Sequence, residues 1–95
     1  MLRISKVLSN SQTTILRAEG EVREEDLSLL VTELESLREK NGRQIVVDLS
    51  AVSFVATEAV DALKDFLGRQ IYFMACRPLV RNLFQAGGLS AMILD

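Results

Sequence analysis

Thr57, Glu58 and Asp61 place a hydroxyl and two carboxylates close together where the sequence pattern predicts the start of a helix. A hydroxyl at this position can cap the helix by accepting a hydrogen bond from an early backbone N–H group. It can also receive a phosphoryl group, because free N–H groups and the helix dipole favour a phosphate there. Thr57 is therefore a candidate N-cap residue and a candidate phosphoacceptor. The carboxylates of Glu58 and Asp61 favour the cap, since they would repel a phosphate.

Groups that usually perform catalysis are missing from the sequence. The chain contains no histidine, so it lacks the usual general base near neutral pH and the commonest metal ligand. It has no glycine-rich phosphate loop, nucleophile elbow or Cys-x-x-Cys pair. The acidic segment Glu24-Glu25-Asp26 is interpreted as a helix start, where the dipole favours carboxylates. We therefore expect no catalytic residues, no cofactor, no metal and no enzymatic activity.

Length and charge restrict the possible partners. The chain has 95 residues and a formal net charge of −2, and its length corresponds to a single domain, residues 1–95. An acidic chain without clustered lysine and arginine is poorly suited to nucleic acid. No apolar run approaches the roughly 20 residues that span a bilayer, and Cys76, the single cysteine, cannot form an internal disulfide. We expect a cytoplasmic protein that neither binds nucleic acid nor inserts into membranes.

Apolar periodicity predicts the elements that must position Thr57. Alternating or continuous apolar segments predict strands over residues 2–8, 13–18, 44–49 and 70–76. Apolar residues at helical spacing predict helices over residues 24–40 and 57–67, and a third that begins at Pro78 and ends before Gly87-Gly88. The order β-β-α-β-α-β-α predicts an α/β fold in which helices pack on a mixed sheet.

The same pattern predicts which segments are buried. The β-branched run Ile45-Val46-Val47 is typical of a central strand that is covered on both faces. The core face of the third helix is expected to consist of Leu79, Val80, Leu83 and Phe84. The apolar tail Met92-Ile93-Leu94 either packs on the domain or takes part in self-association, so a homodimer is one predicted state.

Four short segments follow one another in the order of a known family. They are Gly20-Glu21, Asp48-Leu49-Ser50, Val52-Ser53-Phe54, and the helix of Val80 and Leu83 followed by Gly88-Leu89. In this order they resemble the STAS domain, which is named for sulphate transporters and anti-sigma factor antagonists. The resemblance covers residues 15–89 and implies a STAS-like mixed sheet with helices packed on it.

The resemblance also suggests where a partner binds. In antagonist members, the loop after the third strand reads Asp-Ser-Ser-Gly, and a partner kinase phosphorylates the first serine. The matching residues here are Ala56-Thr57-Glu58-Ala59, which puts Thr57 at the acceptor position and lets Glu58 supply a fixed negative charge instead. The predicted partner-binding surface consists of Glu21, Arg23, Ser53, Ala56, Thr57, Glu58, Val60, Asp61 and Lys64.

Two functions follow from the resemblance. The first is a non-enzymatic protein–protein interaction module in signalling, whose regulatory partner the resemblance implies to be an ATP-binding anti-sigma kinase. The alternative is a constitutive subunit of a larger assembly, such as a stressosome or a transporter, without a phosphorylation switch. The two functions differ at Thr57, because a switch needs an accessible hydroxyl and a constitutive subunit does not.

Overall fold

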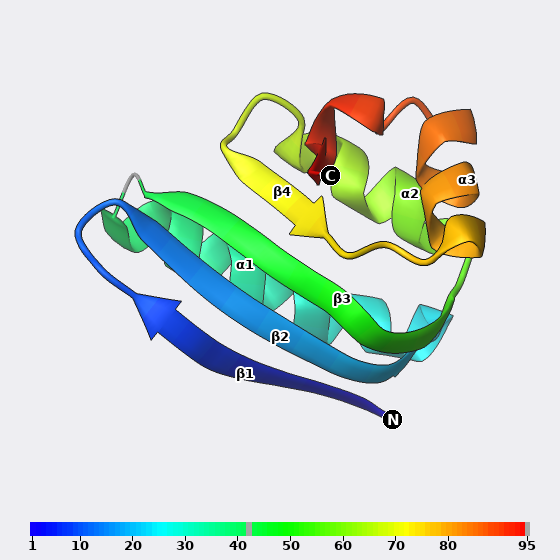
Figure 1. Cartoon of the computed structure of the whole chain (residues 1–95), viewed down its shortest axis with the longest axis horizontal. Helices are drawn as coiled ribbons and strands as arrows, with labels where there is room; N and C mark the ends of the chain where they lie inside the picture. The colour runs from blue at the N-terminus through cyan, green and yellow to red at the C-terminus, as the bar shows by residue number, and fades with distance from the viewer. Residues whose placement is uncertain (42, 95) are drawn as a thin grey trace.

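The computed structural model describes residues 1–41 and 43–94. Within these residues five strands form one mixed sheet in the order β1-β2-β3-β4-β5 (Figure 1). β1 pairs antiparallel with β2, and the remaining neighbours pair in parallel. The strands are β1 (Leu2–Ser9), β2 (Thr13–Val22), β3 (Gln44–Val55), β4 (Ile71–Met74) and β5 (Ile93–Leu94). The predicted mixed α/β fold is confirmed, with β3 at the centre of the sheet.

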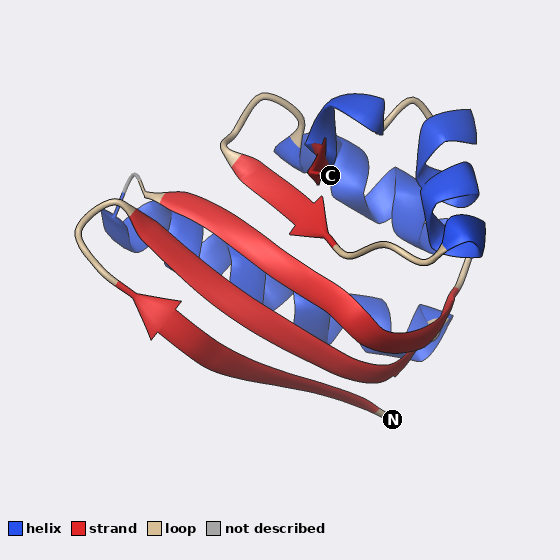
Figure 2. Cartoon of the chain, in the orientation of Figure 1, coloured by secondary structure: helices blue, strands red, loops and turns tan. Residues whose placement is uncertain are grey.

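The helices alternate with the parallel strands (Figure 2). A 3-10 turn (Glu24–Asp26) leads into α1 (Leu27–Asn41), α2 (Glu58–Leu63) continues as a 3-10 turn (Lys64–Phe66), and α3 (Pro78–Ala86) follows β4. Pro78 occupies the first turn of α3, where its missing N–H group costs nothing. α3 ends as the glycine pair predicts, with the Leu89 N–H group donating to the Phe84 carbonyl at 2.8 Å.

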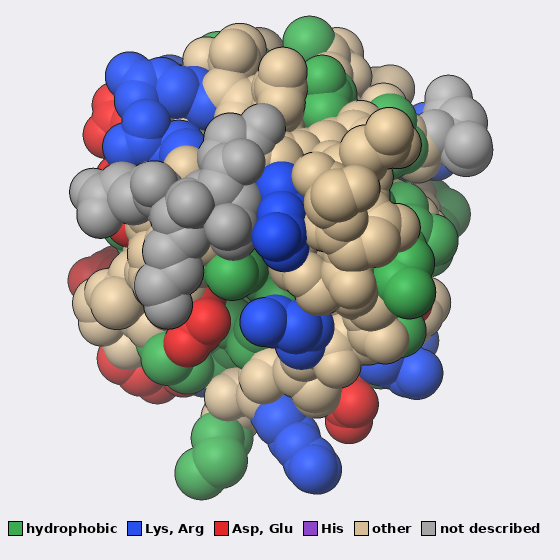
Figure 3. Space-filling model, turned by 90° about the vertical axis from the view of Figure 1, so that its left-hand side faces the viewer, with side chains coloured by type: hydrophobic (Ala, Val, Ile, Leu, Met, Phe, Trp, Pro, Cys, Tyr) green, Lys and Arg blue, Asp and Glu red, His purple; other side chains and the backbone are tan. Residues whose placement is uncertain are grey.

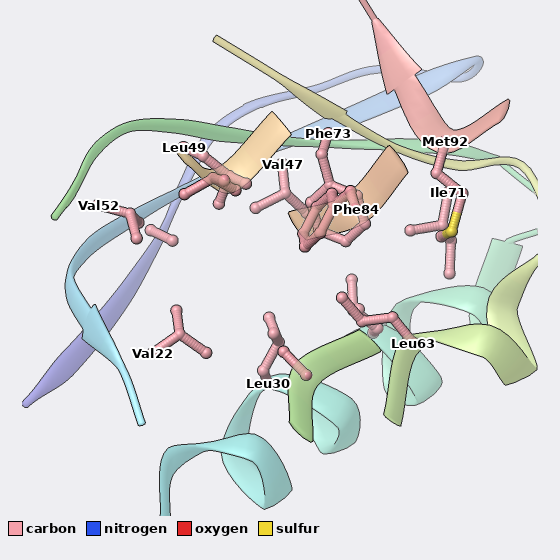
Figure 4. Close-up of a cluster of buried hydrophobic side chains, with 14 of the residues drawn as sticks. Val22, Leu30, Val47, Leu49, Val52, Leu63, Ile71, Phe73, Phe84 and Met92 are labelled. Carbon is pink, nitrogen blue, oxygen red and sulfur yellow. The ribbon is translucent and has the colours of Figure 1, made fainter. Parts of the chain in front are cut away.

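All three helices pack on the same face of the sheet. Val47 and Phe73 are paired across β3 and β4, and both point toward the helices. The Phe84 ring of α3 meets the Phe73 ring edge to face, with 5.2 Å between the ring centres. Leu30 of α1 and Leu63 of α2 complete this core (Figure 4). The strands therefore form one layer of the domain and the helices the other.

Several predicted boundaries differ from the structure. β2 continues past Ala18 to Val22, and β3 continues past Leu49 to Val55. The loop expected before the second helix therefore shrinks to Ala56 and Thr57. α2 is also shorter than predicted, because the last turn before Leu67 is a 3-10 turn. The long parallel pairing with β2 explains the longer β3, since backbone hydrogen bonds to β2 keep its mixed sequence extended.

Two predictions about burial were wrong. Leu79 was expected in the core but is 84% exposed, because α3 faces the sheet with Val80 and Phe84, four residues apart, and Leu79 lies beside that stripe. The second prediction was wrong only about the cover. The β3 run is buried as predicted, with Ile45, Val46 and Val47 at most 7% exposed. The helices of the described chain, however, pack on the face that carries Val47 and not on the face that carries Val46.

The apolar tail packs on the domain. Met92 is buried beside Ile71 (Figure 4), and the segment Ile93–Leu94 forms β5, which extends the sheet beyond β4. Of the two predicted roles of the tail, packing on the domain and self-association, the structure shows the packing. This fifth strand is absent from the predicted element order.

Candidate partner-binding surface

The carboxyl ends of β2 and β3 meet at one edge of the sheet, because the two strands are parallel. Glu21 lies beside Phe54, and the Ala56 N–H group donates to the Val22 carbonyl at 2.7 Å. The register shifts just before this point, and the Ser53 hydroxyl there donates to the Gly20 carbonyl at 3.3 Å. The two strand ends and the start of α2 therefore form one connected unit.

Arg23 holds this edge together through its side chain. Its guanidinium donates two hydrogen bonds to the Glu21 carboxylate, at 2.9 and 3.2 Å. The same group lies 5.7 Å from the centre of the Phe54 ring, close enough for a cation–π interaction. The hydrogen bond and the charge of Glu21 raise the pKa of Arg23 above its usual value. The Arg23 guanidinium remains charged, and the Glu21 carboxylate and the Phe54 ring together fix its orientation.

Thr57 does not cap α2, so that prediction was wrong. Its backbone is already helical, with φ −59° and ψ −31°, and its side chain makes no capping hydrogen bond. A cap residue needs an extended backbone to turn its oxygen back toward the helix N–H groups. The Thr57 hydroxyl instead donates to the Glu58 carboxylate at 3.3 Å. Thr57 is exposed, so its hydroxyl is accessible from solvent.

Glu58 and Glu24 bring two carboxyl groups together across the start of α2 and the 3-10 turn before α1. Hydrogen bonding to Glu58 and the charge of Glu58 raise the pKa of Glu24. The pKa of Glu58 is lowered, first by a backbone N–H group and then by the Glu24 carboxyl. Asp61 on the next turn pairs with Lys64 at 3.3 Å. The surface beside Thr57 is therefore predominantly negative.

An open apolar groove of about 230 Å³ borders Thr57. It runs between the end of β3 and the outer side of α3. Phe54 is 46% exposed at its edge and Leu79 projects beside it. The groove is smaller than the roughly 300–1,000 Å³ typical of small-molecule pockets. It is therefore suited to one apolar side chain of a partner. It is lined by Ser53, Phe54, Val55, Thr57, Leu79, Val80 and Leu83.

Comparison with known proteins identifies the family. The family model described as "STAS domain" matches residues 5–94. The chain belongs to the STAS family. This STAS domain therefore matches the resemblance carried by its sequence motifs, and the matched range begins within β1 and includes β5. A search of curated proteins finds no match.

Solved structures show the same fold at low sequence identity. The unphosphorylated anti-sigma factor antagonist SpoIIAA matches with a TM-score of 0.80 and 16% identity, over 98% of this chain and 87% of its own. The phosphorylated form of the Bacillus cell fate determinant SpoIIAA matches with a TM-score of 0.73 and 15% identity, over 98% of this chain and 90% of its own. An antisigma-factor antagonist STAS domain from Rhodobacter sphaeroides matches with a TM-score of 0.55 and 20% identity, over 73% of this chain and 74% of its own.

The STAS domain brings most residues of the predicted surface together, but two of them are buried. Ala56 and Val60 are 7% and 8% exposed, so their side chains support the surface from below and cannot form it. Sequence reasoning missed Phe54 and Leu79 as exposed members of the groove. Phe54 stood in a recognised family motif, while Leu79 looked like part of a continuous apolar stripe. The other predicted residues, Glu21, Arg23, Ser53, Thr57, Glu58, Asp61 and Lys64, lie along this edge.

The opposite end of the STAS domain carries positive charge (Figure 3). A hollow of about 280 Å³ there is lined by Arg38, Arg43 and Arg69 together with Gly68 and Gln70. Arg38 pairs with Glu35 at 2.8 Å, and Arg43 donates to the Ser9 hydroxyl at 3.0 Å. The described residues contain no group of three metal-ligating side chains. No helix among them is long and apolar enough to cross a membrane.

Proposed function

We propose that this STAS domain is a non-catalytic module that binds a regulatory protein through the edge formed by β2, β3 and α2. The observation that carries the proposal is the exposed pair Phe54 and Leu79 around the groove next to Thr57. Exposed apolar side chains around a hollow, with charged groups at the rim, are typical of protein-binding sites. The partner inserts an apolar side chain into the groove and presents basic groups to Glu58 and Asp61.

The partner that we propose is an ATP-binding anti-sigma kinase. The support is the STAS family membership together with the two SpoIIAA structures, one of an unphosphorylated anti-sigma factor antagonist and one of a phosphorylated cell fate determinant. In this proposal, the kinase approaches the negative start of α2, where the Thr57 hydroxyl is exposed. Phosphorylation of Thr57 would then regulate the complex by adding charge at that contact.

A second candidate function is a constitutive subunit of a larger assembly, without phosphorylation. The contact between the Thr57 hydroxyl and the Glu58 carboxylate favours it, since a phosphate on Thr57 would lie against that carboxylate. Glu24 adds a further carboxyl group to the same place. In this candidate, Glu58 supplies a permanent negative charge to the contact, and the partner remains bound throughout.

A binding experiment tests the proposed surface. The tagged domain recovers its partner from the native host, mass spectrometry identifies that partner, and the purified pair is titrated. We expect Glu58→Lys combined with Asp61→Lys to abolish binding, because the change reverses the sign of the contact. Glu33→Lys is the control, because it reverses the charge of a glutamate on α1, away from the proposed contact. Unchanged binding of the double variant, or equal loss in the control, would place the partner on another surface.

Thr57 separates the two candidates in the same experiment. For a kinase, incubation with ATP places phosphate on Thr57, and Thr57→Ala removes that phosphate and the regulation of binding. For a constitutive subunit, Thr57→Ala binds like the parent, and no phosphate appears on Thr57 in cells. Intact-mass measurement of the purified protein before and after incubation distinguishes these outcomes.

A further inference from the structure

The face of the sheet opposite the helices carries an apolar row across four strands. Leu8 is paired with Ile15, Ile15 with Val46, and Val46 with Tyr72. Residues paired across neighbouring strands point to the same side of a sheet. The core-facing residues Leu16 and Val47 lie one position further along β2 and β3, so this row points away from the core. Leu8 is 48% exposed, and Ile15 and Tyr72 are half-buried.

The next row on this face contains charges of both signs. Ser5 is paired with Arg17, Arg17 with Asp48, and Asp48 with Met74. Arg17 is exposed and lies 3.8 Å from the Glu19 carboxylate. Asp48 is half-buried and accepts a hydrogen bond from the Ser50 N–H group at 2.8 Å. A positive and a negative side chain therefore stand side by side on β2 and β3, directly beside the apolar row.

An uncovered face is unusual for this type of sheet. Four of the five strands, from β2 to β5, run in parallel. Sheets made only of parallel strands almost always have both faces covered, and this sheet departs from that type only at β1. In the described chain, the helices α1, α2 and α3 all pack on the other face, and Figure 1 shows α1 behind β2 and β3. A covering partner would remove Leu8, Ile15 and Tyr72 from water, while Val46 is already buried in the single copy.

We infer that the cover is a second copy of this chain, packed sheet to sheet about a two-fold axis. Two-fold dimers are the commonest oligomers, and their interface must be complementary to itself. An axis parallel to the strands, between β2 and β3, exchanges β2 with β3 and β1 with β4. Ile15 then lies opposite Val46 of the second copy, and Leu8 opposite Tyr72. Arg17 of each copy lies opposite Asp48 of the other, so the dimer contains two pairs of opposite charges.

The dimer needs an interface of standard size, which buries roughly 800 Å² on each partner. The whole molecule extends 32 and 26 Å along its two longer axes, and the sheet face occupies part of that outline. Aligned sheets pack with their mean strand directions within about 30° of each other, which includes the parallel arrangement that this axis gives. The dimer leaves the groove beside Thr57 open, so this inference does not depend on the proposed function.

Sedimentation of the purified chain over a range of concentrations tests the inference. The parent is expected to dimerise, and Arg17→Asp should raise the dimer dissociation constant by roughly tenfold or more, since the axis repeats the repulsion twice. Leu8→Lys should act in the same direction by placing a charge in the apolar row. Both positions are exposed, and circular dichroism confirms that each variant is folded. The matched controls are Arg69→Asp and Leu67→Lys, on the turn between α2 and β4.

Charge exchange gives the sharpest result. The double variant Arg17→Asp with Asp48→Arg should recover dimerisation relative to Arg17→Asp, because the opposed pairs are restored with inverted signs. A parent that stays monomeric up to about 1 mM would overturn the inference and assign the face to a different protein or to another segment of a longer chain. Equal effects of the face variants and their controls would overturn it as well.

Discussion

The guanidinium of Arg23 lies 5.7 Å from the centre of the Phe54 ring and joins the segment after β2 to the end of β3. Glu21 holds the same guanidinium with two hydrogen bonds. The exposed phenyl ring, the anion and the cation therefore form one unit at the edge of the sheet. Because the ring also borders the groove beside Thr57, we expect its position to affect both local stability and the proposed partner binding.

Replacing Arg23 should separate its effect on local stability from its effect on partner binding. Arg23→Lys keeps the charge but loses the paired hydrogen bonds and most of the stacking on Phe54. At an exposed site these contacts contribute little to the free energy of folding. We expect a small decrease in the urea midpoint and a larger loss of partner affinity. A variant that binds the partner as tightly as the parent would show that the position of Phe54 is irrelevant to binding.

Leu34 should be a principal determinant of stability. It is fully buried on α1, so Leu34→Ala is expected to lower the free energy of unfolding by about 2–5 kcal/mol through lost burial and a cavity. Leu29 on the same helix is exposed, and Leu29→Ala should stay within about 0.5 kcal/mol of the parent. Urea denaturation followed by circular dichroism measures both. Similar midpoints for the two variants would contradict the packing of α1.

Gly87 allows the end of α3 to approach α2. A Cβ atom at this position would overlap the Cγ1 atom of Val60. Gly87→Ala should therefore cost about 1–3 kcal/mol, and most of that cost should disappear in a Val60→Ala background. Gly88 is the matched control, because its φ of +83° strains an alanine while no atom lies within 4 Å of the added Cβ. Gly88→Ala should cost about 1–2 kcal/mol in either background, and a double-mutant cycle by urea denaturation checks both.

The carboxyl pair predicts a pH dependence of stability. Glu58 raises the pKa of Glu24 in the folded protein, so the folded state binds that proton more tightly than the unfolded chain. The contribution of Glu24 is therefore present at acid pH and is lost as pH rises through its folded pKa. Glu24→Gln should raise the urea midpoint at pH 7, and the gain should shrink as the pH falls toward the usual glutamate range.

Glu25→Gln provides the control for this prediction. It removes the same charge from the same 3-10 turn without removing the carboxyl group that meets Glu58. Its effect on the midpoint should be smaller and should vary less with pH. A gain for Glu24→Gln that is constant across the titration would refute the proposed interaction between the two carboxyl groups.

Much of the fold follows from residue pattern alone. The Ile45–Val47 run correctly predicted a central strand, and the apolar stripe between Leu27 and Leu37 predicted α1, because both patterns are long enough to be specific. β5 was missed because two residues, Ile93 and Leu94, carry no recognisable period. These two residues form a strand only through backbone pairing with the edge of β4.

The candidate surface was less predictable. The family motif located Thr57 and its neighbours, but whether Thr57 caps a helix depends on its backbone angles, which the residue type does not determine. Leu79 was assigned to the core because four apolar residues lie close together in α3, and only the packing against the sheet shows which of them face inward. The groove itself combines residues from β3 and α3, so no local pattern reveals it.

The order of pairings in the sheet also has a consequence for folding kinetics. β1 and β2 are neighbours along the chain and can form a hairpin locally, on a timescale of about 1–10 μs. Each of the parallel pairings first requires closure of a long crossover, through α1, α2 or α3. The sheet should therefore assemble from the hairpin outward, more slowly than a helical bundle of the same length. Until β5 pairs with it, β4 presents an open edge, which exposes the nearly folded chain to pairing with another chain.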